Sequence, residues 1–337
     1  MRAMLLHSTA SMDQRDKPLT LTDLPRPVAA RGEVLIEVSV CGVCHTELDE
    51  IEGRTPPPVF PVVPGHEIVG TVAETGPGCQ RHAIGDRVGV GWIHSSDGTA
   101  TENISTDFRA TGRDVNGGYA EFMTVAERYA YPIPDAFSDA EAAPLLCAGG
   151  VGYRALRLSG IVDGQILGLT GFGGSGHLVL QLAKHLYPSS PVYVFARSGK
   201  EREFAVELGA DWTGRTECAP PAAPHAIIDT TPVWKPVLAA LEHLRPGGRL
   251  VINAIRKESA DQALMATIRY EDHLWQEKEI KTVANITHRD IAEFLPIAAS
   301  AAIKVEVQSY PLEAANEALQ DLRAGHVRGA KVLFIHK

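Results

Sequence analysis

A chain of 337 residues, 45 % of them hydrophobic, is long enough for two domains that each bury a core of ordinary size. Its net charge of −9 argues against nucleic acid or an anionic membrane as a partner, because both attract positively charged surfaces. No uninterrupted apolar run is long enough to span a bilayer, and residues 1–10 lack the apolar core of a signal peptide. We therefore expect a cytoplasmic protein, whose five cysteines are metal ligands or buried apolar side chains rather than disulfides.

Residues 1 to about 145 are predicted to form a β-rich domain. Short, β-branched and alternating segments occupy residues 34–40, 68–72 and 87–90. Gly and Pro residues separate these segments, as in Pro64-Gly65. Many short strands with frequent turns are typical of an all-β, barrel-like unit.

From about residue 150 to 285, apolar strands alternate with helical segments. We predict strands at 165–170, 192–196, 226–229 and 249–255, and helices at 177–186, 200–208 and 234–244. This alternation implies βαβ units and a parallel sheet, so the fold class is α/β with an all-β-rich domain and a doubly wound domain.

The last part of the chain contains a predicted helix at 290–302 and a predicted strand at 331–335. We expect this strand to return to the first domain. The predicted domain boundaries are therefore 1–149, 150–285 and 286–337.

A glycine-rich loop follows the strand predicted at 165–170 and precedes a helix. It has the pattern G-x-G-x-x-G, with glycines at Gly171, Gly173, Gly174 and Gly176. Such a loop lets the backbone approach a pyrophosphate, and the helix N-terminus offers free N–H groups to the phosphates. The alternative is a simple turn, but the strand before the loop and the helix after it favour a dinucleotide site.

The end of the second strand carries the evidence on the type of cofactor. An NAD site usually has an Asp or Glu here, which binds the ribose 2′-hydroxyl. This chain has Ala196, then Arg197 and Ser198, a cation and a hydroxyl that suit a 2′-phosphate. We therefore predict that NADP(H) is preferred and NAD(H) possible, with Glu201 facing solvent from the next helix. The alternative is that Arg197 is an ordinary solvated charge.

Three segments carry side chains that zinc accepts as ligands. They are Cys41-Gly42-Val43-Cys44-His45-Thr46, Gly65-His66-Glu67 and the region around Cys147. A catalytic zinc site has three protein ligands and keeps one position open. Spacing alone leaves other possibilities, because Cys41 competes with Cys44, C-x-x-C can be a redox pair, and a Cys or His can simply be buried.

Several longer motifs follow one another along the chain, among them CGVCHTELDEIEG, VPGHEIVGTV, GDRVGVGW, GGYAEF, APLLCAGGVGYRALR and GFGGSGHLVLQLAK. In this order, and over nearly the whole chain, they resemble those of the zinc-containing alcohol dehydrogenases of the medium-chain dehydrogenase/reductase superfamily. The resemblance implies a GroES-like domain and a Rossmann domain, with the C-terminal segment returning to the first domain.

The resemblance also implies roles for individual residues. Cys44, His66 and Cys147 would bind one catalytic zinc per chain, and Glu67 would lie behind them as a carboxylate that can approach the metal. The Thr46 hydroxyl would start a proton relay. By the same resemblance, Trp92 would form a wall of the substrate pocket. Cys41 matches a position that is not a ligand in the family, and Cys79 and Cys218 match no functional position.

The chain departs from this family at several places. Relatives often hold a structural zinc with four cysteines after Trp92, but residues 92–106 contain none, so we expect no metal there. In many relatives the proton relay ends at a His where this chain has Asp49, so we expect Asp49 or His45 to accept the proton. Relatives also commonly have an Asp where this chain has Glu47, so the carboxylate beside the ligands is carried here on a longer side chain.

The function predicted from these motifs is a zinc-dependent alcohol dehydrogenase that acts on a small alcohol or aldehyde. We expect it to be a homo-oligomer, either a dimer or a tetramer. One alternative is a zinc-free quinone or enone reductase, which has no reason to carry Cys44, His66 and Cys147 together. Another is a catalytically idle binding protein on the same fold, against which the intact ligands and glycine loop argue.

Overall fold

The computed structural model describes residues 1–325 and 329–336. They form two compact units. The first unit comprises Met1–Cys147, Ile286–Ala299 and Lys304–Lys337, and the second comprises Ala148–Asn285 and Ser300–Ile303. None of the helices in the described ranges is both long and apolar enough to cross a membrane.

The first unit is built on a sheet in which, among the described residues, β16, β17, β3, β4, β5 and β9 are neighbours in that order and β8 also pairs with β3. Small two-stranded sheets, β1–β2 and β6–β7, lie beside it in the same unit. The strands are β1 (Arg2–Leu6), β2 (Leu19–Asp23), β3 (Glu33–Val43), β4 (Ile68–Thr75), β5 (Arg87–Val90), β6 (Ile93–Ser95), β7 (Arg109–Ala110), β8 (Phe122–Ala126), β9 (Ala130–Pro132), β16 (Val307–Pro311) and β17 (Ala330–Phe334).

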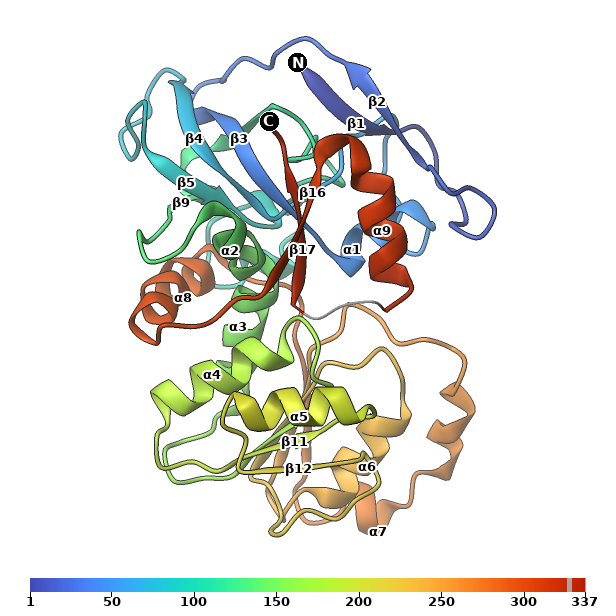
Figure 1. The fold of residues 1–337 in the computed structure, drawn as a ribbon. Coiled ribbons are helices and arrows are strands. Elements are labelled where there is room, and N and C mark those ends of the chain that lie inside the picture. Colours follow the sequence, from blue (N-terminus) through green and yellow to red (C-terminus); the bar gives the residue numbers. More distant parts are fainter. Residues whose placement is uncertain (326–328, 337) are drawn as a thin grey trace. The chain divides into compact units, whose positions relative to one another are not determined.

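The long strand β3 holds this unit together because it pairs with β4, β8 and β17. Its valine and isoleucine side chains are buried, as the alternating, β-branched sequence predicts. The C-terminal strand β17 runs antiparallel to β3, from Lys331 opposite Val43 to Phe334 opposite Val40 (Figure 1). The C-terminal strand therefore joins the sheet of the first unit.

Four helices accompany this sheet in the described part of the chain: α1 (His45–Ile51), α2 (Asp139–Pro144), α8 (His288–Ser300) and α9 (Ala315–Arg323). Helix α8 begins two residues before the predicted start. The reason is a reciprocal cap, in which the Thr287 hydroxyl accepts from Asp290 N while the Asp290 carboxylate accepts from Thr287 N.

The second unit contains a sheet whose neighbouring strands are all parallel. Its order in the described residues is β12-β11-β10-β13-β14-β15, so the chain starts in the middle and winds first to one side and then to the other. This is the strand order of a dinucleotide-binding Rossmann fold. The strands are β10 (Leu167–Thr170), β11 (Val192–Phe195), β12 (Trp212–Gly214), β13 (Ala226–Asp229), β14 (Arg249–Ile252) and β15 (Glu279–Thr282).

The helices of this second unit are α3 (Gly150–Ser159), α4 (Gly176–Leu186), α5 (Gly199–Glu207), α6 (Lys235–His243) and α7 (Tyr270–His273). The residues of β10 and β13 are buried, as expected for strands with both faces covered. Against β13 and β14, α6 packs Val237 and Leu241 in a cluster with Ile227 and Leu250.

The fold class predicted from the sequence is confirmed by this arrangement. The prediction of a strand at 249–255 was too long, because β14 ends at Ile252. Both neighbouring strands stop at the same level, with Asp229 and Thr282 opposite Ile252, so residues beyond it have no ladder to join.

Candidate metal and catalytic site

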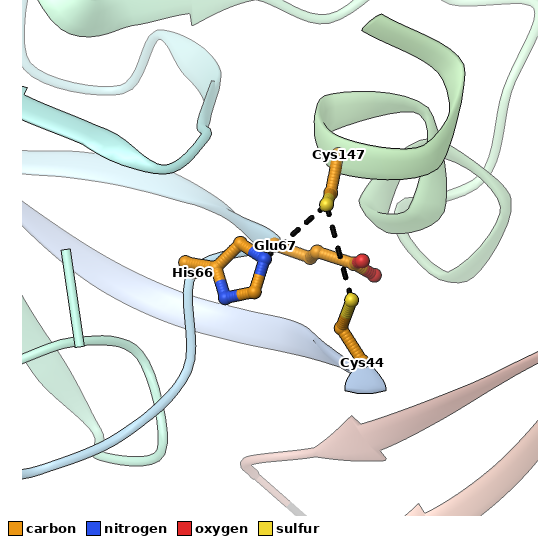
Figure 2. A group of neighbouring side chains, drawn as sticks. All are labelled: Cys44, His66, Glu67 and Cys147. Carbon is orange, nitrogen blue, oxygen red and sulfur yellow. Dashed lines mark hydrogen bonds between the residues drawn. The ribbon is translucent and has the colours of Figure 1, made fainter. Parts of the chain in front are cut away.

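The side chains of Cys44, His66, Glu67 and Cys147 converge in the first unit, with one ligand atom from each lying within 4.8 Å of the others (Figure 2). His66 Nε2 is 3.3 Å from Cys147 Sγ, and the two sulfur atoms are 3.9 Å apart. Two thiolates and an imidazole are zinc ligands of the usual type, and a nearby carboxylate is compatible with them. The residues present therefore fit a zinc ion.

Two paired strands and one wide helical turn position these four side chains. Cys44 directly follows β3 and is the N-cap residue of α1, while His66 and Glu67 directly precede β4, which pairs with β3. A Cβ atom at Gly42 would lie 1.9 Å from Glu67 Oε2, so only glycine leaves room for this carboxylate. Cys147 lies on a π-helical turn, Leu145–Gly149, which follows α2.

The Glu47 carboxylate holds His66 in the orientation that a metal ligand needs. Glu47 Oε1 is 2.5 Å from His66 Nδ1, and Glu47 Oε2 accepts a hydrogen bond of 2.8 Å from the backbone N–H of Cys44. Both side chains are buried. Because Nδ1 is occupied, Nε2 is the nitrogen that faces the two cysteines, as in metal sites where a carboxylate orients a histidine ligand.

The pKa values of the four candidate ligands are shifted, in part because several groups that can carry a negative charge lie close together. The hydrogen bond with Cys147 lowers the pKa of Cys44 well below its usual value, and the same contact raises the pKa of Cys147. Burial, followed by the charge of Cys44, raises the pKa of Glu67. Burial lowers the pKa of His66, but the charges and hydrogen bonds of Glu47 and Cys44 together outweigh burial and leave that pKa well above its usual value. A divalent cation among these atoms would relieve the repulsion between the anions.

The remaining cysteines lie outside this group. Cys41 is fully buried, and burial raises its pKa. Cys79 donates a hydrogen bond to the Glu33 carbonyl, and Cys218 is exposed.

The residues predicted for proton transfer occupy different surroundings. Thr46 is buried, and its Oγ1 is 3.6 Å from Cys44 Sγ, so it lies beside the metal ligands. Asp49 is also buried and forms an ion pair of 2.5 Å with Arg54, a partner that the sequence analysis did not foresee. His45 is exposed.

Trp92 lies near the same group, with its ring centre 6.1 Å from that of His66. Phe108 packs edge-on against Trp92 at 5.7 Å. The two aromatic rings therefore form an apolar surface next to a candidate ligand.

In the second unit, the glycine loop joins β10 to α4 as predicted. Gly171 has a φ of +82°, which favours glycine, and a Cβ at Gly176 would lie 2.7 Å from the Gly171 carbonyl oxygen. A Cβ at Gly173 would meet nothing within 4 Å. The first and last glycines therefore serve the turn itself, while Gly173 leaves the backbone open to a ligand.

Beside this loop lies a buried network that the sequence analysis missed. The Asp229 carboxylate, at the end of β13, accepts a hydrogen bond of 2.6 Å from Thr170 Oγ1 and one of 2.8 Å from Thr231 Oγ1. It also forms an ion pair with Lys257. These contacts connect the ends of β10 and β13 with the segment that follows β14, at the edge where doubly wound sheets bind their ligands.

The end of β11 differs from the prediction in one respect. Ser198 caps α5: its Oγ accepts from Glu201 N, while its own N–H and hydroxyl donate to Glu201 Oε2. The expectation that Glu201 faces solvent is therefore wrong, because its carboxylate is bonded to the turn. Arg197 is exposed, whereas Arg202 Nη1 donates to the carbonyl of Ala196. The S-x-x-E signature of a capping box was visible in the sequence.

The cysteine-free segment 92–106 is anchored by a buried carboxylate. Glu102 Oε1 accepts from the backbone N–H of His288 and lies 2.6 Å from His288 Nδ1, and Glu102 Oε2 accepts from the Tyr129 hydroxyl. Only the tertiary structure brings Glu102 and His288 together, because 186 positions separate them in the chain.

Comparison with known proteins agrees with this geometry. Residues 30–135 match the model of the alcohol dehydrogenase GroES-like domain, and residues 213–333 match that of the zinc-binding dehydrogenases. The chain is 39 % identical to the probable alcohol dehydrogenase AdhA of Mycobacterium tuberculosis, over 99 % of this chain and 97 % of that protein. It belongs to the alcohol dehydrogenases of the medium-chain dehydrogenase/reductase superfamily.

Other members of the family match over a similar length. An alcohol dehydrogenase of Geobacillus stearothermophilus is 32 % identical over 97 % of this chain and 99 % of its own. The solved alcohol dehydrogenase of the archaeon Aeropyrum pernix superposes with a TM-score of 0.85 at 25 % identity, covering 99 % of this chain and all of that one. The predicted combination of a GroES-like and a Rossmann domain is thus confirmed, as is the assignment to the oxidoreductases.

Proposed function

We propose that the protein is a zinc-dependent dehydrogenase that transfers hydride between a small alcohol or aldehyde and a nicotinamide cofactor. The proposal rests mainly on one observation, the convergence of ligand atoms from Cys44, His66, Glu67 and Cys147 within 4.8 Å. Cys44, His66 and Cys147 would hold one zinc ion per chain, with Glu67 close enough to approach it.

The chemistry divides between the bound groups and the chain. When bound, zinc supplies a Lewis acid that makes an alcohol easier to deprotonate, and the nicotinamide accepts or donates the hydride. The chain supplies the orientation of His66 through Glu47. Trp92 and Phe108 supply an apolar wall that would hold the carbon part of a small substrate and exclude water.

Proton movement would begin at Thr46, whose hydroxyl lies beside Cys44. Of the two acceptors predicted from the sequence, His45 is better placed to exchange a proton with water because it is exposed. Asp49 is held in an ion pair by Arg54, so its carboxylate is already engaged with another side chain. We therefore assign the larger part of the relay to Thr46 and His45, and a smaller part to Asp49.

The glycine loop would bind the cofactor pyrophosphate with Gly171, Gly173, Gly174 and Gly176 at the N-terminus of α4. We retain the proposal that NADP(H) is preferred, since no carboxylate ends β11 and Arg197 is exposed there. Ser198, the other predicted contact, is bonded to Glu201 and would have to exchange that partner for a phosphate. Comparing kcat/KM for NADP and NAD in the wild type and in Arg197→Ala tests this preference, because an unchanged ratio contradicts it.

No specific observation on the described residues favours either alternative function. A zinc-free quinone or enone reductase leaves two half-buried thiols beside a buried histidine without a purpose, and so does an idle binding protein. The homo-oligomeric state and the cytoplasmic location stay predictions.

The test is an activity panel of primary, secondary and aromatic alcohols and their aldehydes or ketones, run with both cofactors before and after removal of zinc by a chelator. We expect turnover that disappears with the metal and returns when zinc is added. Undiminished activity of the metal-free enzyme would contradict zinc dependence, and an absence of turnover on every substrate would contradict the proposed reaction.

A further inference from the structure

The segment after β11 lies directly beside the glycine loop. Strands β10 and β11 pair in parallel register with Thr170 opposite Phe195, and Gly171 N donates a hydrogen bond of 2.9 Å to the Phe195 carbonyl. The residues that follow Phe195 therefore border the loop that would hold the pyrophosphate. In this fold the ribose of the adenosine half is recognised at that position.

Glu201 controls the hydrogen-bonding groups of this segment. Its Oε2 accepts from Ser198 N at 3.1 Å and from Ser198 Oγ at 2.8 Å. These two donors would otherwise be available to a phosphate. Its other oxygen, Oε1, has no hydrogen bond to any residue in the described part of the chain, and so remains able to accept one from a ligand.

We propose that Glu201 is a specificity-determining residue, which supplies from the first turn of α5 the carboxylate that the end of β11 lacks. A free ribose 2′-hydroxyl can donate to this carboxylate, whereas a 2′-phosphate is repelled by its charge and deprived of the Ser198 donors. The inference rests on the proposed nicotinamide cofactor. The Glu201 carboxylate would act against the cationic side chains that attract a 2′-phosphate.

The surrounding charges do not cancel this effect. Arg197 and Lys200 are exposed, and exposed charges are screened by salt and water. Arg202 uses Nη1 to bind the carbonyls of Ala196 and Arg197, and so stabilises the turn. The balance between Arg197 and Glu201 then sets how strongly one cofactor is preferred.

Calorimetric titration of the full chain with NAD and with NADP, without any alcohol, measures this balance independently of turnover. The test variant is Glu201→Gln, because glutamine also completes a capping box and leaves α5 capped. The matched control is Glu203→Gln, which removes the same charge from an exposed position on the same helix. We expect Glu201→Gln to shift the ratio of the two dissociation constants about tenfold towards NADP, and Glu203→Gln to shift it by about twofold or less.

The outcomes separate the two proposals. If neither cofactor binds to the wild type, the proposed nicotinamide chemistry fails. If both bind but Glu201→Gln leaves the ratio unchanged, or if Glu203→Gln shifts it equally, the role of Glu201 is overturned while the proposed function stands. A tenfold shift confined to Glu201→Gln supports the inference.

Discussion

Two clusters in the first unit each contain a buried carboxylate, and they differ in how its oxygens are satisfied. Glu102 has both oxygens bonded, one to His288 and the other to Tyr129. Glu67 instead lies with two thiols and an imidazole, and its surroundings raise its pKa. Burial of a carboxylate therefore does not by itself mark a metal site. What matters is whether the protein supplies enough donors, because unpaired buried anions are costly.

The Glu67 cluster is suited to bind a metal, whereas the Glu102 cluster anchors a segment of the chain. The Glu67 cluster gathers electron-pair donors from segments that Gly42 and a π-helical turn allow to approach closely. The Glu102 cluster connects residues 92–106 to the start of α8. Hydrogen bonds here hold a segment that has no cysteine for a metal.

The largest effect should follow removal of a thiolate ligand. We expect Cys147→Ser to lose zinc and about 10³-fold in activity, because the metal would provide several kcal/mol of transition-state stabilisation. Metal analysis and kcat/KM measure both effects. Cys41→Ser is the matched control, since Cys41 lies outside the group, and equal losses in the two variants would contradict the assignment.

A second variant separates proton transfer from metal binding. Thr46→Ala should keep its zinc but lose about 10²–10⁴-fold in kcat, as expected when a group that transfers a proton is removed. Asp49→Asn should cost about tenfold or less, because Asp49 is held by Arg54. If steady-state kinetics show that Asp49→Asn is as impaired as Thr46→Ala, then Asp49 rather than His45 accepts the proton from the relay.

A third variant tests the orientation of the histidine ligand. Glu47→Gln should weaken zinc binding or activity by about 10- to 100-fold, because the amide interacts more weakly with His66 Nδ1 than the carboxylate does. Competition with a chromogenic chelator measures the zinc affinity. An unchanged affinity would show that His66 does not depend on Glu47.

The smallest effect on chemistry should come from the other cluster. Glu102→Gln should lower the free energy of unfolding by about 1–3 kcal/mol through weaker bonds to His288 and Tyr129, and leave zinc content and kcat unchanged. Urea denaturation followed by circular dichroism measures the change in stability. Loss of zinc from a folded Glu102→Gln protein would contradict the distinction between the two clusters.

Local patterns allowed much of the fold and the site to be predicted. The glycine loop lies within one strand–turn–helix unit, and the hydrophobic alternation of β3 shows in its own sequence. The ligands Cys44, His66 and Cys147 emerged only with the family resemblance, since spacing alone left Cys41 open. The capping box of Ser198 and Glu201 was also local, but the nearby Arg197 drew the interpretation towards a phosphate.

Contacts between distant segments could not be predicted in the same way. The pairing of Glu102 with His288 depends on tertiary structure, and neither residue lies in a recognisable motif. Glu50 is a second case, because it is buried and its burial raises its pKa. The polar sequence of the helix around it gives no indication of this burial. Lys257, which pairs with Asp229 from a segment beyond β14, is a third case.

The zinc content of the purified wild-type protein tests the distinction between the two clusters most directly. After dialysis against a weak chelator, metal analysis should find one tightly held zinc per chain, lost in Cys147→Ser and retained in Glu102→Gln. Two tightly held zinc ions per chain, or none in an active enzyme, would contradict the account.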